Sequence, residues 1–592
     1  MDDKQPGWKK FQNLKFSSKD IAKSARKAEA TTIRHARKFI ARRISNIYDV
    51  RRNIAIWMIG IAVLIVTIGL QQAWFRQSYT HTAPVSGGAY AEGILGKVNS
   101  LNPLYATTEP EKAMTRLVFS SLLQYDSAGV LGNDAASSYR VEDGGKRVVV
   151  TLRPDVRWHD GTLMTVKDVV FTTELMKNKA TRSQYESQWS SIDVKQSGDR
   201  DIIFTLPAVY SALPHVLTFP ILPEHILRDV KPTELRESDF SRSPIGSGPF
   251  AFKLSQPDKE RHIINLTAFE DYFRGSPRLE RFEIHTYTSR GEIKKALQLG
   301  EITATGDIET DKDITDKRFD VVQKPLNSGV YAFFNMSQPS VSDVKVRRAL
   351  NSSLDIIKLR SQTRAKYPLS GPFVAGQVSG VDDLNWQTYD KQAAEKLLDE
   401  AGWKLDGEFR KKDNQTLTMS VVTTNDPKIE RAARFIADTW KGIGAKVDLN
   451  VVDPNDASRD FTQNTIQARA YDVLIHEISI GADPDVYAFW HSSQANSRGL
   501  NLSMYKGGLS DDALTSARSR IETPLRDAKY LAFAKQWQRD IPAIGLYQTQ
   551  MTYIGYPSAR SLAKNQQLVS SVDRYSTAIH WTTATGDVYN TP

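Results

Sequence analysis

The sequence predicts a mixed α/β protein with more than one lobe, preceded by one transmembrane helix. Three observations lead to this. The chain has 592 residues, which exceeds the size at which a single hydrophobic core stops growing, so two or three packed lobes are expected. From about residue 88 onward, strand and helix patterns alternate between turn residues, as in α/β proteins. Between Arg52 and Arg76 lies a stretch of 23 residues without a charge.

This uncharged stretch, residues 53–75, is the predicted membrane segment. As a helix it spans roughly 35 Å, enough to cross a bilayer. Trp57 and Trp74 lie near its ends, where amphipathic rings favour the interface. The alternatives are a buried core helix and a cleaved signal peptide, but no small-residue cleavage pattern follows Leu70. We therefore expect an uncleaved signal anchor.

The basic charge of the chain is confined to its N-terminus. Residues 1–52 carry 15 Lys and Arg against 5 Asp and Glu, and the remaining 63 basic and 63 acidic residues balance. This pattern predicts a cytoplasmic tail (1–52), a linker (76–87) and an extracytoplasmic body (88–592) without nucleic-acid binding. Lys19–Arg52 is expected to form a basic helix that either lies on the inner leaflet or stays solvated. The absence of cysteine excludes disulfides and thiolate metal sites.

Within the body, several elements can be placed by local pattern. Val148–Leu152 is a strand that leads into the turn 159–162, His-Asp-Gly-Thr, and a helix begins at Thr165 with Asp168 as its capping-box partner. Ile202–Leu206 is a further strand. Three more helices are expected, over Lys345–Leu359, Lys391–Ala401 and Lys428–Gly442.

The order of these motifs resembles one family, the extracytoplasmic solute-binding proteins of peptide/nickel ABC importers. The resemblance covers residues 88 to about 575. Besides the strand, turn and helix of 148–173, it includes LNPL (101–104), FSSLLQY (119–125), SGPF (247–250), FEDYFRGSP (269–277), FN with VKVRRAL (334–350) and YDKQAAEKLLDEAGW (389–403). Seven such segments in the right order make a chance resemblance implausible.

The resemblance implies the two-lobed periplasmic-binding-protein type II fold with an added small subdomain. Lobe one would comprise 88–325 and 547–592, with the subdomain at about 120–240, and lobe two 330–545. The two crossings, near Tyr331–Asn335 and Ile544–Gln548, would act as hinges.

A binder of many peptides should hold the peptide backbone by strand-like hydrogen bonds and neutralise the N-terminal ammonium with a carboxylate. The segment EISIGADPDVYAFWH (477–491) can provide both. It resembles the family's Asp-Pro-Asp segment, whose aspartate pairs with the ligand amine in peptide-binding members. Asp483 is the first candidate for that role and Asp485 the second, with Ile480, Gly481 and Ala482 offering backbone groups. The alternative is that both aspartates cap the following helix.

Further candidates lie on both lobes. Thr108 and Glu109, in the segment Thr107–Glu111, would offer groups from lobe one, unless they belong to an ordinary loop before a helix. Asn501 either lines or braces the cleft, and Trp490 either packs in the core or meets the ligand. No motif of a hydrolase, phosphate loop or metal site is present in the sequence, so neither a catalytic residue nor a metal or cofactor is expected.

The sequence thus predicts a membrane-anchored substrate-binding subunit of an ABC importer, not an enzyme. It would act as a monomer, bind oligopeptides between its lobes and deliver them to permease subunits. Two alternatives stay open. One is another solute, such as a metal chelate or an oligosaccharide. The other is a sensor that signals through the transmembrane helix.

Overall fold

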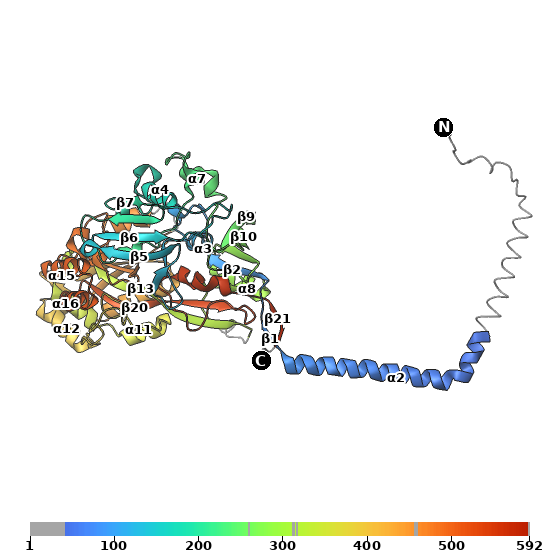
Figure 1. Ribbon diagram of the computed structural model, residues 1–592. Coiled ribbons are helices and arrows are strands. Elements are labelled where there is room, and N and C mark those ends of the chain that lie inside the picture. Colours follow the sequence, from blue (N-terminus) through green and yellow to red (C-terminus); the bar gives the residue numbers. More distant parts are fainter. Residues whose placement is uncertain are drawn as a thin grey trace, which may run out of the picture. The chain divides into compact units, whose positions relative to one another are not determined.

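The computed structural model describes residues 42–258, 261–310, 314, 318–386, 388–454 and 460–589. The chain separates into two compact units, Met1–Ala83 with Gly586–Pro592, and Pro84–Thr585. Each is described by itself (Figure 1).

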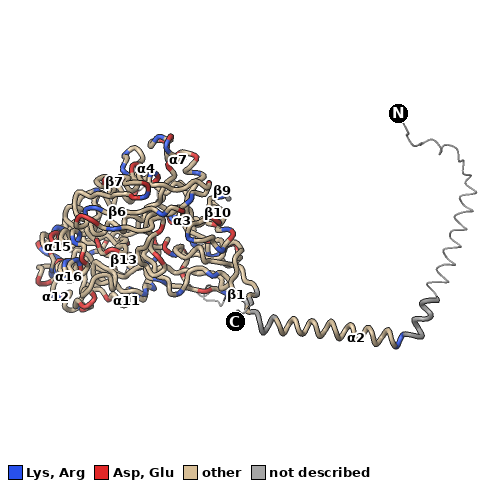
Figure 2. Tube along the Cα trace, in the orientation of Figure 1, with Lys and Arg blue, Asp and Glu red and all other residues tan. Residues whose placement is uncertain are grey.

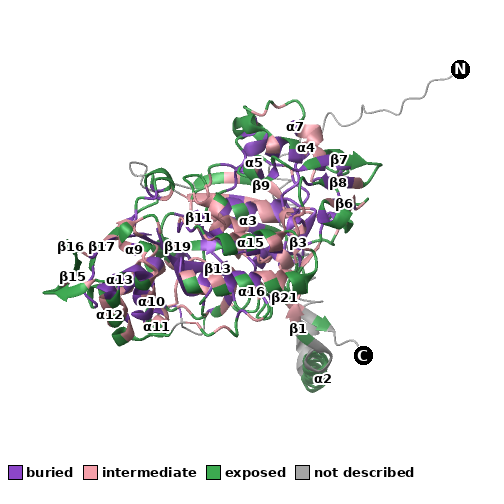
Figure 3. Cartoon of the chain, turned by 90° about the vertical axis from the view of Figure 1, so that its left-hand side faces the viewer, coloured by how far each residue is buried: buried purple, intermediate pink, exposed green. Residues whose placement is uncertain are grey.

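The N-terminal unit is built on one long helix, α2 (Arg42–Tyr79). Its stretch Arg51–Phe75 is long and apolar enough to cross a membrane, and none of it is buried. In Figure 2 the helix carries no charged residue between Arg52 and Phe75, and Figure 3 colours its described residues as exposed. Strand β1 (Thr80–Pro84) pairs with β21 (Thr585–Tyr589). Of the basic helix expected over Lys19–Arg52, residues 19–41 lie outside the described part of the chain.

A ten-stranded mixed sheet runs through the second unit. In spatial order its strands are β18 (Lys446–Val452), β17 (Thr418–Thr424), β19 (Val473–Ser479), β13 (Asp320–Phe334), β20 (Ala543–Gly555), β12 (Ala304–Thr305), β2 (Ala89–Leu95), β11 (Arg281–Tyr287), β10 (Arg261–Ala268) and β9 (Phe250–Asp258).

Two groups of hydrophobic clusters pack on this sheet and define two lobes. The first lobe is built on buried residues between Tyr90 and Phe319 and between Met551 and Trp581. The second lobe is built on buried residues between Val330 and Tyr547. Such separate cores are expected for a chain of this size.

Among the strands of the described residues, only β13 and β20 belong to both lobes. Their pairing is antiparallel and has a register shift between Pro325 and Gly329, opposite Gln548–Gln550. The change from one core to the other occurs at this irregularity, slightly N-terminal to the expected hinge at Tyr331–Asn335. That the strands bend here when the lobes move stays a prediction.

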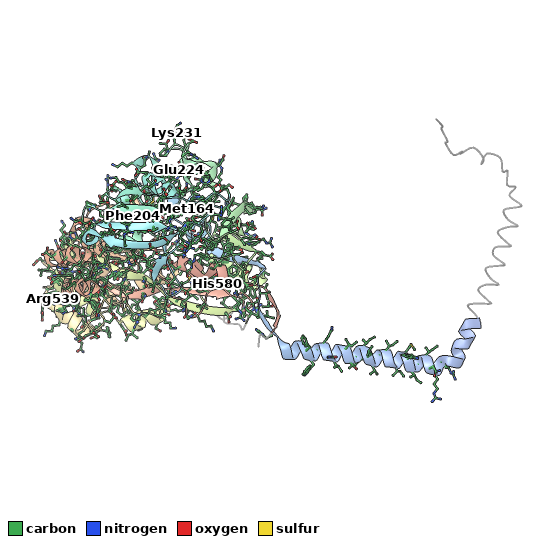
Figure 4. All side chains as sticks on the ribbon, in the orientation of Figure 1. Met164, Phe204, Glu224, Lys231, Arg539 and His580 are labelled. Atoms are coloured by element: carbon green, nitrogen blue, oxygen red, sulfur yellow. The ribbon has the colours of Figure 1, made fainter. Side chains whose placement is uncertain are left out.

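The first lobe contains a four-stranded antiparallel sheet in the order β5 (Ala136–Glu142), β6 (Arg147–Leu152), β8 (Asp201–Thr205), β7 (Asp193–Ser197). Phe204 of β8 and Met164, which precedes the N-cap of α4, are both buried (Figure 4). The predicted capping box is confirmed, since Thr165 N–H donates to Asp168 Oδ2 at 2.7 Å and α4 follows. The helices of this lobe are α3 (Glu109–Val118), α4 (Val166–Lys177), α5 (Glu186–Trp189), α6 (Leu213–Val216), α7 (Glu224–Leu227) and α8 (Arg290–Leu299), and β3 (Leu123–Tyr125) pairs with β4 (Leu131–Asn133).

The second lobe is mainly helical around its half of the sheet. Its helices are α9 (Pro339–Ser342), α10 (Val344–Ser352), α11 (Ile356–Thr363), α12 (Lys391–Glu400), α13 (Pro427–Lys441), α14 (Tyr487–Trp490), α15 (Gly508–Arg518) and α16 (Thr523–Asp540), with a small sheet of β14 (Lys404–Asp406), β15 (Phe409–Lys412) and β16 (Gln415–Thr416).

One predicted helix of this lobe is wrong in its extent. Lys345–Leu359 was expected to be continuous, but α10 ends at Ser352 and α11 begins at Ile356. The side chain of Asp355 accepts a hydrogen bond from Lys358 N–H at 2.9 Å. Asp355 therefore starts a new helix as its N-cap, because aspartate satisfies the free N–H groups of a first turn.

Candidate functional site

A cavity of about 360 Å³ lies between the two lobes. Its lining comes from β2, α3, α8 and the C-terminal segment of the first lobe, from α13, β19 and the residues after α11 of the second, and from β13 and β20. The lining residues are Ile94, Glu109, Arg290, Gly306, Asp307, Leu326, Val330, Arg364, Ala365, Asp426, Lys428, Ile429, Glu477, Tyr547, Gln548, Thr549, Gln550, Met551, Ser571 and Arg574. Its volume falls in the usual range of small-molecule sites.

Several charges at this cavity are already paired. Arg290 Nη2 lies 3.0 Å from Asp426 Oδ2, which joins α8 of the first lobe to the N-cap of α13 in the second. Glu109 Oε2 accepts a hydrogen bond from Ser571 Oγ at 2.6 Å, and its Oε1 lies 3.1 Å from Lys112 Nζ. These groups form part of the cavity wall, but their charges are largely neutralised by their partners and are less available to a ligand.

Arg574 belongs to a buried cluster behind the wall. Its Nε donates to Glu92 Oε1 at 2.8 Å, and Tyr575 Oη donates to Glu92 Oε2 at 2.8 Å. Both charged side chains are almost completely buried, with exposed fractions of 3% and 0%. Burial raises the pKa of Glu92, and the guanidinium of Arg574 opposes that rise. The cluster fastens the C-terminal segment to β2.

Three charged side chains at the cavity have no ion-pair partner among the described residues: Asp307, Glu477 and Lys428. Asp307 Oδ2 accepts from the N–H of Leu95 at 2.8 Å, and Glu477 Oε1 accepts from Ser328 Oγ at 2.7 Å. Desolvation by the surrounding protein raises the pKa of both carboxyl groups. The cavity therefore offers two carboxylates and one ammonium group to a polar ligand.

Asp483, the first candidate from the sequence, lies outside this lining. Its two carboxylate oxygens are 2.7 and 2.9 Å from Arg526 Nη2, and both side chains are nearly buried. His215 Nε2 of the first lobe lies 3.7 Å from Asp483 Oδ2, and burial lowers the pKa of this histidine. An incoming amine would have to share the carboxylate with Arg526, so the predicted pairing stays a prediction.

Asp485 is likewise occupied. Its Oδ2 accepts from Arg518 Nε and Nη2 at 3.0 and 2.8 Å, and its Oδ1 accepts a long 3.4 Å bond from Tyr487 N–H at the start of α14. The Arg518 guanidinium lies 4.8 Å from the ring of Tyr210, and its carbonyl accepts from Ser211 N–H at 3.1 Å. Tyr210 and Ser211 belong to the first lobe, so this region of the second lobe is in contact with the first.

The backbone of 480–482 is engaged as well. The N–H groups of Ile480 and Gly481 donate to Asn327 O at 2.8 and 3.0 Å. The carbonyls of Gly481 and Ala482 accept from Gln377 Nε2 at 3.0 and 3.3 Å. Gly481 has φ 81°, a conformation that favours glycine. A ligand could reach these carbonyls only by displacing the flexible Gln377 side chain.

The remaining candidates are spread over the structure. Glu109 lines the cavity, whereas Thr108 forms a capping box with Glu111 at the start of α3. Asn501 is fully buried and donates to the carbonyls of His491 and Tyr505. These bonds correspond to the interpretation in which Asn501 braces the cleft. Trp490 is fully buried against Phe333 and Trp537, with ring centroids 5.7 and 5.6 Å apart.

The sequence did not point to Glu477, Asp307, Tyr547 or Lys428 as site residues. One signal was present for Glu477, because it interrupts the apolar strand Val473–Ser479 with a charge. A second cavity of about 550 Å³ is lined only by second-lobe residues between Arg348 and Gly545. Because it does not join the lobes, we do not regard it as the solute site. Within the described residues, no group of three or more His, Asp or Glu side chains could hold a metal ion.

Comparison with known proteins decides the class of the molecule. Residues 131–499 match the model of the bacterial extracellular solute-binding proteins, family 5. The chain belongs to this family. It is thus a substrate-binding protein of the peptide/nickel type of ABC importer and not an enzyme, and the resemblance found in the sequence is confirmed.

Individual proteins that are similar to this chain support the family assignment. The oligopeptide-binding protein AppA of Bacillus subtilis is 28% identical over 520 residues, which cover 84% of this chain and 94% of that protein. The glutathione-binding protein GsiB of Pectobacterium atrosepticum is 23% identical over 65% of this chain and 74% of its own length.

Solved structures confirm the predicted type II fold. AppA of B. subtilis in complex with a nonapeptide matches with a TM-score of 0.71 at 25% identity, covering 85% of this chain and 100% of that one. NikZ of Campylobacter jejuni in complex with Ni(L-His) matches with a TM-score of 0.71 at 23% identity, covering 83% and 99%.

Proposed function

We propose that this family member binds oligopeptides in the cavity between its lobes and delivers them to permease subunits of an ABC importer. The observation that carries the proposal is the composition of the cavity wall. Two carboxylates and an ammonium group without ion-pair partners among the described residues, Asp307, Glu477 and Lys428, lie beside apolar side chains. A peptide has the matching chemistry, since it carries an ammonium group, a carboxylate and a backbone of donors and acceptors.

The relatives support a peptide over other solutes. The most extensive match described above is an oligopeptide-binding protein, and its length is covered almost completely. The similarity to NikZ supports the same fold at lower identity.

Closure of the lobes would exclude water and complete the site. Contacts between the lobes occur at the cavity wall, at Arg290–Asp426, and away from its lining, at Ser211–Arg518. With the lobes apart, a peptide could enter, and bonds to both walls would then favour the closed state. We also propose that the protein acts as a monomer.

We further propose that Arg51–Phe75 anchors the protein as a single-pass helix. Its length and apolar composition support this. The excess of Lys and Arg before it favours a cytoplasmic N-terminus and an extracytoplasmic body. Protease treatment of intact cells should degrade the body and leave a membrane-bound N-terminal fragment.

The function is tested by purifying the full chain in mild detergent and analysing bound solutes by mass spectrometry after denaturation. The proposal predicts a mixture of short peptides, recovered unaltered. Recovery of a metal chelate or an oligosaccharide in place of peptides contradicts it.

A further inference from the structure

Glu477 lies in a row of three residues on neighbouring strands of the central sheet. In β19, β13 and β20, Glu477 is opposite Val330, and Val330 is opposite Tyr547. Directly opposed residues of antiparallel strands project from the same face of a sheet. All three residues line the interlobe cavity. The sheet thus presents a carboxylate and a phenol to the same space, with Val330 between them.

The phenol of this row is a polar group without a partner. Tyr547 has an exposed fraction of only 3%, and its hydroxyl makes no hydrogen bond with any described residue. A buried hydroxyl left unsatisfied costs roughly 1–3 kcal/mol. Such groups are rare in folded proteins and call for an explanation. A ligand atom in the cavity would satisfy this hydroxyl.

The carboxylate of the row is incompletely satisfied. Glu477 accepts a hydrogen bond from Ser328 Oγ at 2.7 Å, and Thr549 is a second hydroxyl partner. No cation of the described residues pairs with it, and its side chain is accessible from the cavity. Enough protein surrounds it that desolvation raises the pKa of its carboxyl group. A cationic ligand group would restore its charge balance.

Asp483 is less suited to receive an ammonium group. Both of its oxygens already face Arg526 at 2.7 and 2.9 Å, so a second cation beside them would meet the positive charge of the guanidinium. Glu477 has no such competitor among the described residues. The two carboxylates therefore differ in the charge they have left for a ligand.

From this geometry we infer that Glu477 receives the N-terminal ammonium group of the bound peptide and that the Tyr547 hydroxyl bonds to a polar atom beside it. The inference rests on the proposed peptide-binding function and names the residues that set its specificity for a free amine. Lys428, on the same cavity wall, carries the charge that suits a carboxylate of the ligand.

The test uses the full chain in detergent and a mixed tripeptide library in free and N-acetylated forms. Peptides retained after gel filtration are counted by mass spectrometry. The wild type should retain free tripeptides in preference to acetylated ones. Glu477→Gln should lower the retention of free tripeptides by about tenfold and abolish the preference, as expected for loss of a charge-assisted hydrogen bond. Glu395→Gln, an exposed carboxylate of α12, is the matched control and should behave like the wild type.

Tyr547→Phe makes the test independent of folding, because it removes only a hydroxyl without a protein partner. It should lower retention about threefold or more without lowering the melting temperature. The inference is overturned if Glu477→Gln still prefers free amines, or if Tyr547→Phe binds like the wild type. A wild type that retains no tripeptide in either form contradicts the peptide-binding proposal itself, which is a different result.

Discussion

Arg290 of α8 and Asp426 at the N-cap of α13 join the two lobes at one edge of the cavity, with 3.0 Å between Nη2 and Oδ2. Near them, Glu309 of the first lobe lies 2.8 Å from Arg431 and 3.8 Å from Arg364 of the second. These ion pairs cross from one lobe to the other, so they would be broken if the lobes moved apart. Closure of the lobes should therefore depend on these surface charges.

Asp426→Asn should weaken peptide binding by up to about fivefold, because a partly exposed ion pair contributes no more than about 1 kcal/mol. Asparagine is also a good N-cap, so α13 should keep its stability. Titration at low and high salt is the measurement, and the variant should lose part of the salt dependence of the wild type. Asp406→Asn, whose partner Lys411 is in the same lobe, is the control. Equal salt dependence of Asp426→Asn and wild type would contradict a role in closure.

Asp483→Asn should lower the stability of the body, because Arg526 loses its carboxylate while its side chain is only 12% exposed. Removal of one partner from a nearly buried pair costs about 3 kcal/mol. The double variant Asp483→Asn, Arg526→Gln should recover part of this loss. Chemical unfolding of the three variants measures it. If Asp483→Asn instead abolished peptide binding at unchanged stability, Asp483 and not Glu477 would be the amine-binding carboxylate.

Arg574→Met should be strongly destabilising, by about 3–5 kcal/mol, since it leaves the fully buried Glu92 without its cation. The double variant with Glu92→Gln should be more stable than Arg574→Met alone. Thermal unfolding of both variants provides the comparison. A single variant as stable as the wild type would show that the cluster does not hold the C-terminal segment.

Stability should fall in mild acid because two half-buried histidines resist protonation. Burial lowers the pKa of His159 and of His476 to about 4. Gly246 N–H donates to His159 Nδ1, so Nε2–H donates to Gly248 O and the neutral ring is satisfied. Below pH 6.5 the unfolded chain binds protons that the folded protein does not. Stability is therefore complete above pH 6.5 and decreases down to pH 4, by roughly 3 kcal/mol per histidine.

His476→Leu should remove about half of this decrease, because His476 is one of the two histidines whose pKa is lowered to about 4. The substitution should cost little else, because His476 Nδ1 has no hydrogen-bond partner among the described residues. Urea unfolding of variant and wild type at pH 8, 6 and 5 is the measurement. Near pH 8 the variant should be at least as stable as the wild type. An unchanged loss between pH 8 and 5 would show that this histidine does not contribute.

The parts of the fold that could be predicted depend on residues close in sequence. The capping box of Thr165 and Asp168 spans one helical turn, so its pattern is visible in the chain. The break between α10 and α11 was missed because Asp355 continues the polar face of a helix pattern, although its side chain caps a new helix.

The site could be predicted only in part, because its contacts join distant residues. Glu477 and Tyr547 reach the same cavity because each is paired with Val330, which lies on the strand between theirs. Asp483 could be recognised as the family's aspartate, but nothing in its neighbourhood of the sequence reveals the bond to Arg526, 43 residues away. Pairing across the sheet, and between the loop of Asp483 and α16, decides which carboxylate is free.

The most direct test of the account follows lobe closure in solution. The sequence has no cysteine, so Lys231→Cys in the first lobe and Arg539→Cys in the second can carry two fluorophores without further changes (Figure 4). Energy transfer between them is measured in the full chain while a tripeptide library is added. We predict a rise to a single high-transfer state with free tripeptides and little change with N-acetylated ones. Transfer that stays the same with both libraries would contradict a peptide-driven closure of the two lobes.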